Sequence, residues 1–267
     1  MFWVNILKKK FCLIGYPLKH SYSDRIHQSL FKMNNYNAIY NFEEIKPYDL
    51  ENSIIYLKNN YDGFNVTSPY KKNIINFLDE LDFSARKVNA VNTVYNLKGK
   101  LIGYNTDIFG FEQFLKIKNI KLGCSACVIG SGGAANIVIF SLLNNKLSVT
   151  VAIRNCTSEK IKVIKSNYKN ANLNVVDINN IEGYYDILVN ATPVGMYPEV
   201  NDSVVGENVL KYVDTVIDLI YNPKVTKLMK LAQNYGCKIY NGYDMLIWQA
   251  IGAQNIWLGK DMYDFKK

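Results

Sequence analysis

The segment ACVIGSGGAANIVIF, residues 126–140, limits the fold of this chain more than any other. A short apolar run suited to a buried strand leads into a glycine-rich turn, and an apolar stretch of helical length follows. The turn matches G-x-G-x-x-G/A through Gly130, Gly132 and Ala135. In this pattern the glycines permit a tight turn and a close approach to a pyrophosphate, and the small third residue lets helix and strand pack. The segment predicts a dinucleotide-binding α/β domain; the alternative is a turn that needs glycine only for its backbone angles.

Strand-like and helix-like segments alternate along the rest of the chain. The first five form a β-α-β-α-β series, which favours a parallel sheet with right-handed crossovers. A hairpin turning at Asn96–Gly99 is expected within residues 91–107. Strands are predicted at 11–15, 38–45, 61–67, 126–130, 148–153, 173–177, 186–190 and 213–220, and helices at 24–34, 48–60, 71–82, 108–119, 131–145 and 245–259.

This order predicts two α/β domains. The N-terminal domain, with a mostly parallel sheet, covers residues 1–107 and is joined by the C-terminal helix, about residues 243–267. The second, of Rossmann type, covers residues 108–242. Ligands of such sheets bind outside the carboxyl ends of the strands, so we expect a cleft between the domains.

The composition argues against several other classes of protein. Hydrophobic residues make up 49% of the chain and charged residues 20%, which is ordinary for a globular protein. No apolar run approaches the ~20 residues that span a bilayer, and the N-terminus lacks the order of a secretory signal, so we expect a cytoplasmic protein. The net charge of +8 is dispersed apart from Lys8–Lys10. It suits solvation or anionic small molecules, and nothing indicates nucleic-acid or membrane binding.

Five cysteines include one C-x-x-C pair, Cys124 and Cys127. A zinc or redox site is one interpretation of such a pair. No second pair or nearby histidine completes a metal site, and the pair runs into an apolar strand. We therefore expect no metal and at least one thiol that serves packing.

The end of the second strand of the dinucleotide domain indicates which dinucleotide is bound. NAD-binding proteins usually carry an acidic residue about 20 residues after the glycine turn, where it binds the ribose 2′-hydroxyl. Here VTVAIRN offers Arg154 and no carboxylate. A guanidinium suits a 2′-phosphate, so NADP is favoured. The alternative is a solvated charge at the end of a strand.

Lys71 and Asp107 are candidates for proton chemistry. An enzyme that transfers hydride to or from a carbonyl group needs a proton donor and acceptor beside the reacting carbon. Lys71 follows the third predicted strand in NVTSPYK, and Asp107 ends the predicted hairpin. On spacing alone Lys71 could equally be a solvated lysine, and Asp107 the N-cap of the following helix.

Eight motifs resemble the shikimate dehydrogenase family and occur in the family's order: IGYPLKHSYSDRIH, FNVTSPYK, NAVNT, GYNTD, GSGGAA, NATPVGM, DLIYNP and GYDMLIWQA. The resemblance implies that Lys71 is catalytic, with Asp107 as its partner. It implies that the substrate is bound by Ser21, Ser23, Asn65, Thr67, Asn92, Tyr221 and Gln249. The implied cofactor contacts are Gly130, Ser131, Gly132, Gly133, Ala134, Arg154, Thr192 and Gly242.

The family resemblance implies NADPH-dependent reduction of 3-dehydroshikimate to shikimate, on the path to chorismate and the aromatic amino acids, by a monomer or homodimer. The N-terminal domain would then bind the substrate and carry the catalytic pair. Alternatives are a quinate/shikimate dehydrogenase that uses NAD, and a non-catalytic dinucleotide-binding regulator. The chain departs from the family pattern at Asp24, Ser158 and Asp244, where proline, a second basic residue and glycine are usual. His20 and His27 are not needed as acid or base, and His27 is expected to pack or to lie on the surface.

Overall fold

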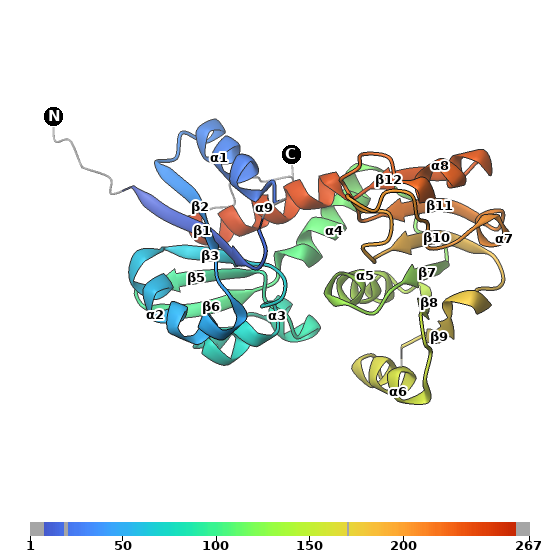
Figure 1. Cartoon of the computed structure of the whole chain (residues 1–267), viewed down its shortest axis with the longest axis horizontal. Coiled ribbons are helices and arrows are strands. Elements are labelled where there is room, and N and C mark those ends of the chain that lie inside the picture. The colour runs from blue at the N-terminus through green and yellow to red at the C-terminus, as the bar shows by residue number, and fades with distance from the viewer. Residues whose placement is uncertain (1–7, 19–20, 170, 260–267) are drawn as a thin grey trace. The chain divides into compact units, whose positions relative to one another are not determined.

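The computed structural model describes residues 8–18, 21–169 and 171–259 (Figure 1). The chain forms two compact units, one from the residues up to Gly110 together with those from Ile247 onward, and the other from Phe111–Leu246. Helices α4 (Thr106–Ile117) and α9 (Tyr243–Leu258) run from one unit into the other. Within the described ranges, no helix is both long enough and apolar enough to cross a membrane.

The first unit is built on a six-stranded sheet in the order β2-β1-β3-β5-β6-β4. Strand β1 pairs in parallel with both β2 and β3, as the β-α-β-α-β pattern predicts, and β5 and β6 form the predicted antiparallel hairpin. The elements of this unit before α4 are β1 (Lys9–Gly15), α1 (Ser23–Met33), β2 (Ala38–Glu44), η1 (Pro47–Asp49), α2 (Leu50–Asn60), β3 (Gly63–Val66), η2 (Asn73–Phe77), β4 (Glu80–Leu81), α3 (Phe83–Val88), β5 (Thr93–Leu97) and β6 (Lys100–Tyr104).

Strand β1 supplies side chains to both faces of this sheet. Successive side chains of a strand point to opposite faces. Phe11 and Leu13 accordingly pack in a cluster that includes α1 and α9 residues, whereas Cys12 and Ile14 pack in one that includes α2 and α3 residues. In Figure 1, α1 and α9 lie on one face of the sheet and α2 and α3 on the other. The near-continuous apolar run of β1 thus reflects a strand buried on both sides.

The hairpin turn is made by Lys98 and Gly99, with φ of 52° and 87°. A two-residue turn with positive φ at both positions matches the twist of the strands it joins. Asn96 completes the turn, because its Oδ1 accepts a hydrogen bond from the Gly99 N–H at 2.9 Å.

The prediction of a helix over residues 71–82 is wrong. Only the short 3₁₀ helix η2 forms there, and the chain then becomes strand β4, which pairs in parallel with β6. The N–H groups of Asp79 and Asp82 donate to the carbonyls of Leu101 and Gly103. The open edge of the hairpin therefore binds this backbone, and sheet pairing overrides a helical pattern of apolar residues.

The second unit is an entirely parallel sheet within its described strands, in the order β12-β11-β10-β7-β8-β9. Read from β9, this is the order 3-2-1-4-5-6 of the Rossmann fold, whose ligands bind where the order reverses, here between β7 and β10. Its elements are β7 (Ser125–Ile129), α5 (Gly133–Asn144), β8 (Ser148–Ile153), α6 (Ser158–Asn167), β9 (Leu173–Asp177), η3 (Ile178–Asn180), β10 (Tyr185–Asn190), α7 (Glu207–Leu210), β11 (Val213–Asp218), α8 (Lys227–Asn234) and β12 (Lys238–Asn241).

Cys127 lies in the core of the second unit. Burial raises the pKa of this thiol to about 12, so it stays protonated and packs as a small apolar residue. The expectation that one thiol of the C-x-x-C pair serves packing is confirmed.

His27 is a core residue rather than a surface one. Its ring stacks on that of Tyr40, with centroids 4.2 Å apart, and Gln254 of α9 lies 3.2 Å from its Nδ1. Burial lowers the pKa of His27 to about 3. The imidazole is therefore neutral at physiological pH and serves packing.

Candidate active site

Lys71 and Asp107 form an ion pair in the first unit. Lys71 lies in the turn after β3, Asp107 lies in the first turn of α4, and Nζ of the lysine is 2.7 Å from Oδ2 of the carboxylate. Both side chains are partly exposed, at 32% and 15%. The pair thus combines a fixed geometry with access from solvent, as a group that meets a substrate requires.

Asp107 does not cap α4, because the helix begins at Thr106 and the Asp107 N–H donates to Oδ1 of Asn105. Its Oδ1 instead accepts a hydrogen bond from Nδ2 of Asn92 at 2.8 Å. With one oxygen bound to Asn92 and the other to Lys71, the carboxylate has a single orientation.

Asn92 is buried and holds this arrangement together. Its Nδ2 donates to Thr106 Oγ1 as well as to Asp107, and its Oδ1 accepts from the Thr106 N–H at 2.8 Å. Both amide hydrogens are therefore used inside the protein. In this structure Asn92 acts on the site by fixing Asp107 and the first turn of α4.

Asn65, the last residue but one of β3, is also internally satisfied. Its Nδ2 donates to the Asn92 carbonyl at 3.0 Å and to Thr93 Oγ1 at 2.9 Å, and its Oδ1 accepts from the Tyr40 hydroxyl at 2.7 Å. This side chain joins β2, β3 and β5 and binds the backbone of Asn92. Tyr40 was not singled out from the sequence, because a tyrosine within a predicted strand carries no signal of its partner.

The remaining predicted substrate residues of the N-terminal part are polar groups near strand ends. Thr67 follows β3, and its methyl group would meet a Cβ at position 15 at 2.4 Å, so Gly15 permits this approach. Ser21 and Ser23 lie at the start of α1, where the Ser21 hydroxyl donates to Ser23 Oγ at 3.1 Å. Asp24 lies in the first turn of α1, where the helix dipole favours a carboxylate.

Tyr221, Gly242 and Gln249 belong to different units: Tyr221 and Gly242 lie in the second and Gln249, on α9, in the first. A Cβ at position 242 would lie 2.0 Å from the Leu219 carbonyl oxygen, so only glycine fits there. Asp244, at the start of α9, forms an ion pair with Lys118 at 2.9 Å, so the charge at this departure from the family pattern is paired.

A cavity of about 1150 Å³ opens at the carboxyl ends of β7, β8 and β10. Gly130, with φ of 114°, requires the left-handed region that glycine tolerates, and a Cβ there would lie 3.1 Å from Thr192. Gly132 caps α5 and has open space where a Cβ would lie. Bare backbone and a helix N-terminus therefore face a cavity large enough for a dinucleotide.

Of the predicted cofactor residues, five line this cavity: Gly130, Ser131, Gly132, Arg154 and Thr192. Gly133 and Ala134 are exposed in the first turn of α5 outside its lining, and Gly242 lies elsewhere in the second unit. Ala135 is fully buried, as the third position of the glycine pattern requires for packing.

A lysine that no motif selected, Lys160, also lines the cavity. Lys160 lines it beside Arg154, and Nζ of Lys160 is 3.5 Å from the Arg154 carbonyl oxygen. Ser158, the position considered for a second basic residue, does not line it. The signal was available in TSEK, because Thr157 caps α6 and so places Lys160 in the first turn, next to the end of β8.

The carboxylates of Asp177 and Asp202 share the cavity lining with these cations. Asp177 is held by the backbone N–H groups of Asn179 and Cys156, which lower its pKa. The negative charge of Asp177 is thus bound by N–H groups of the segments that follow β8 and β9. The two cations beside it suit a ligand that carries a phosphate.

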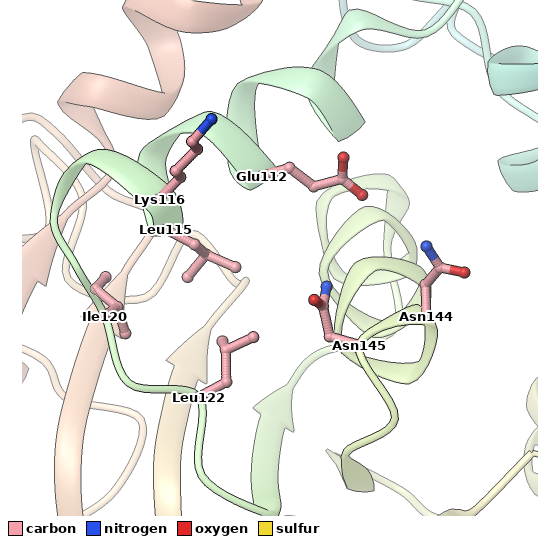
Figure 2. Close-up of a pocket in the computed structure, with 7 residues that line it drawn as sticks. All are labelled: Glu112, Leu115, Lys116, Ile120, Leu122, Asn144 and Asn145. Carbon is pink, nitrogen blue, oxygen red and sulfur yellow. The ribbon is translucent and has the colours of Figure 1, made fainter. Parts of the chain in front are cut away.

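A second, smaller cavity of about 350 Å³ lies between α4 and the end of α5 (Figure 2). Glu112 directs its carboxylate toward α5, and burial raises the pKa of this group. All seven lining residues lie outside the predicted site: Glu112, Leu115, Lys116, Ile120, Leu122, Asn144 and Asn145.

The fold and the large cavity are those of a dinucleotide-binding α/β protein, with a parallel sheet, a glycine turn and two cations suited to a phosphate. The ion pair of Lys71 and Asp107 adds a group for proton chemistry. Residues 13–94 match the family model described as the shikimate dehydrogenase substrate binding domain. Together with a relative that is 41% identical over 96% of this chain, this match shows that the chain belongs to the shikimate dehydrogenase family.

Relatives of known name match almost the whole chain. The shikimate dehydrogenase (NADP(+)) of Caldanaerobacter subterraneus subsp. tengcongensis is 41% identical over 265 residues, covering 96% of this chain and 94% of the relative. The protein of the same name from Methanococcus maripaludis strain C6 is 39% identical, with 96% and 94% covered.

Solved structures agree with the fold. A chorismate mutase/shikimate 5-dehydrogenase fusion protein from Clostridium acetobutylicum superposes with a TM-score of 0.89 at 32% identity, covering 96% of this chain and 93% of that one. Shikimate 5-dehydrogenase from Thermus thermophilus, in complex with NADP(H) and shikimate, gives 0.86 at 30% identity, with 94% of each chain covered.

Proposed function

We propose that this chain catalyses the NADPH-dependent reduction of 3-dehydroshikimate to shikimate. The observation that carries the proposal is the ion pair of Lys71 and Asp107 at 2.7 Å, with Asp107 held by Asn92, in a chain of this family. An alcohol–ketone interconversion needs a positioned proton donor at the oxygen, and this pair supplies one.

The cofactor would be held by the cavity at the ends of β7, β8 and β10. The bare backbone of Gly130 and Gly132 suits the pyrophosphate, and Arg154 with Lys160 suits a 2′-phosphate. When bound, NADPH supplies the hydride that turns the carbonyl carbon of the substrate into an alcohol carbon.

Lys71 acts at the substrate oxygen. Its ammonium donates a hydrogen bond to the carbonyl and stabilises the negative charge that develops there. One of its protons moves to that oxygen to complete the alcohol, and solvent returns a proton to the amine. Asp107 orients the ammonium throughout, because Asn92 fixes the carboxylate.

The substrate is a small polyhydroxylated acid, so its site needs hydroxyl and amide groups. We propose that Ser21 and Ser23 bind its carboxylate and that Thr67, Tyr221 and Gln249 bind its hydroxyls. Asn65 and Asn92 then contribute mainly by holding Thr93 and Asp107 in place, since their amide hydrogens are already bound within the protein.

We further propose that residues 1–107 with the C-terminal helix form the substrate and catalytic domain, residues 108–242 form the cofactor domain, and the enzyme works in the cytoplasm as a monomer or homodimer. Cell fractionation and size-exclusion chromatography with light scattering measure the last two points.

The decisive experiment is NADPH oxidation, followed by absorbance, with 3-dehydroshikimate as substrate. NADH in place of NADPH, and quinate with NAD in the reverse direction, are the parallel assays. Rapid oxidation of NADPH supports the proposal. Faster turnover with quinate and NAD would favour the related quinate activity, and no substrate-dependent change with either cofactor would favour a regulator.

A further inference from the structure

Two adjacent strands of the second unit end in fully buried polar residues. Asn190 ends β10 and Asp218 ends β11, and the two are partners in the sheet register. A buried carboxylate is costly unless it is hydrogen bonded, and packing alone would be served by an apolar residue here. The position of Asp218 therefore calls for a reason other than stability.

Asp218 is bound by hydrogen-bond donors only. Oδ1 accepts from Nδ2 of Asn190 at 3.0 Å and from the Ile220 N–H at 3.2 Å, and Oδ2 accepts from the Thr226 hydroxyl at 2.6 Å. Burial raises the pKa of Asp218 to about 6, so at neutral pH the carboxylate is ionised and can only accept hydrogen bonds. The Asn190 amide consequently turns its donor, Nδ2, toward Asp218 and its acceptor, Oδ1, away from it.

The orientation of Asn190 in turn decides what Thr192 can do. With Nδ2 directed at Asp218, Oδ1 accepts from the Thr192 N–H at 3.0 Å and from its hydroxyl at 2.7 Å. Thr192 lines the large cavity, with its methyl group 3.1 Å from where a Cβ on Gly130 would lie. Asp218 thus acts on the cavity wall through Asn190 and Thr192.

We propose that Asp218 is a positioning residue for the dinucleotide: through the Asn190 amide it fixes Thr192 and the loop after β10 against the glycine turn. The inference rests on the proposed cofactor site. Asparagine at position 218 would have the same shape as aspartate but could donate a hydrogen bond as well as accept one. The side-chain amide of Asn190 could then take either of its two orientations.

The test is NADP+ binding by calorimetry to the intact protein and to Asp218→Asn, Thr192→Val and the double variant. We expect Asp218→Asn alone to weaken NADP+ binding about tenfold. In the Thr192→Val background the same change should cost less, about threefold, because that variant removes the hydroxyl bond to Asn190 and leaves only the N–H bond of residue 192. Equal losses in both backgrounds would overturn the proposal.

Asp186→Asn is the matched control. Asp186 lies near the opposite end of β10, where its carboxylate accepts from the Cys124 N–H and from the Ser125 N–H and hydroxyl. The Asp186→Asn variant should have a lower melting temperature and an unchanged affinity for NADP+. NADP+ binding by Asp218→Asn as tight as that of Asp186→Asn would also refute the positioning role.

Two further outcomes are distinguishable. If the unaltered protein does not bind NADP+, the proposed function fails, and the positioning role fails with it. If Asp218→Asn does not fold by circular dichroism, Thr226→Val replaces it, because this variant keeps the carboxylate and removes the donor to Oδ2. Weakened binding by Thr226→Val that persists fully in the Thr192→Val background overturns the proposal.

Discussion

Replacing Lys160 with alanine should reduce affinity for NADP+ and leave affinity for NAD+ unchanged. Lys160 and Arg154 are the two cations that line the large cavity, and both are exposed at its rim. The two dinucleotides differ by one phosphate, which carries a charge of about −1.5 to −2 at neutral pH. A cation that binds this group therefore affects only one of them.

The size of the effect follows from exposure. A charge-assisted hydrogen bond contributes about 1.5–3 kcal/mol when shielded, and an exposed ion pair about 0–1 kcal/mol. We take about 1 kcal/mol for Lys160, or about a fivefold loss at 1.4 kcal/mol per tenfold. Arg154 can bind bidentately, so Arg154→Ala should lose about 2 kcal/mol, or about 30-fold.

Calorimetric titration with each dinucleotide at low and high salt measures both values. Lys162→Ala is the control, because Lys162 lies on the same helix outside the cavity lining. The NADP+ preference should shrink as salt screens the exposed charges. Equal losses for NADP+ and NAD+, or a loss in Lys162→Ala as large as in Lys160→Ala, would refute the reasoning.

Two other predictions concern the first unit. Lys71→Ala should lower kcat for 3-dehydroshikimate reduction by about 10²–10⁴ with NADP+ affinity unchanged. The control Lys72→Ala, at the exposed neighbouring position, should be active. An undiminished kcat in Lys71→Ala would exclude Lys71 from the mechanism. His27 has a folded-state pKa of about 3 against 6.5 when exposed, so its contribution to stability is present above pH 6.5 and is lost as pH falls toward 3. Urea unfolding should show about 2 kcal/mol more loss between about pH 7.5 and pH 5 in the unaltered protein than in His27→Gln, and equal losses would contradict the buried neutral imidazole.

Much of the fold could be read from local sequence patterns. The strand–glycine turn–helix at residues 126–140 and the hairpin at Lys98 and Gly99 form as predicted, because backbone angles and side-chain periodicity are properties of a short segment. The helix predicted over residues 71–82 failed because β6, about 20 residues further along the chain, binds that backbone as a sheet neighbour. No local pattern contains that partner.

The candidate site shows the same division. Motifs selected Lys71 and Asp107 as a pair, but spacing alone left Asp107 open to the role of helix cap. The start of α4 at Thr106 and the bond from the Asp107 N–H to Asn105 decide against that role. No motif selected Lys160, and only the structure shows that the capped first turn of α6 places it beside Arg154 in the cavity lining.

The sequence by itself determined which residue types and which elements this protein has: alternating strands and helices, a glycine turn, and polar groups at strand ends. The tertiary structure decided which of those groups are hydrogen bonded inside the protein and which line a cavity. Asn65 and Asn92 are bound within the protein, whereas Arg154 and Lys160 line a cavity. The physical reason is that hydrogen bonds and cavities depend on atoms brought together from distant parts of the chain, whereas strand and helix patterns depend on neighbours in sequence.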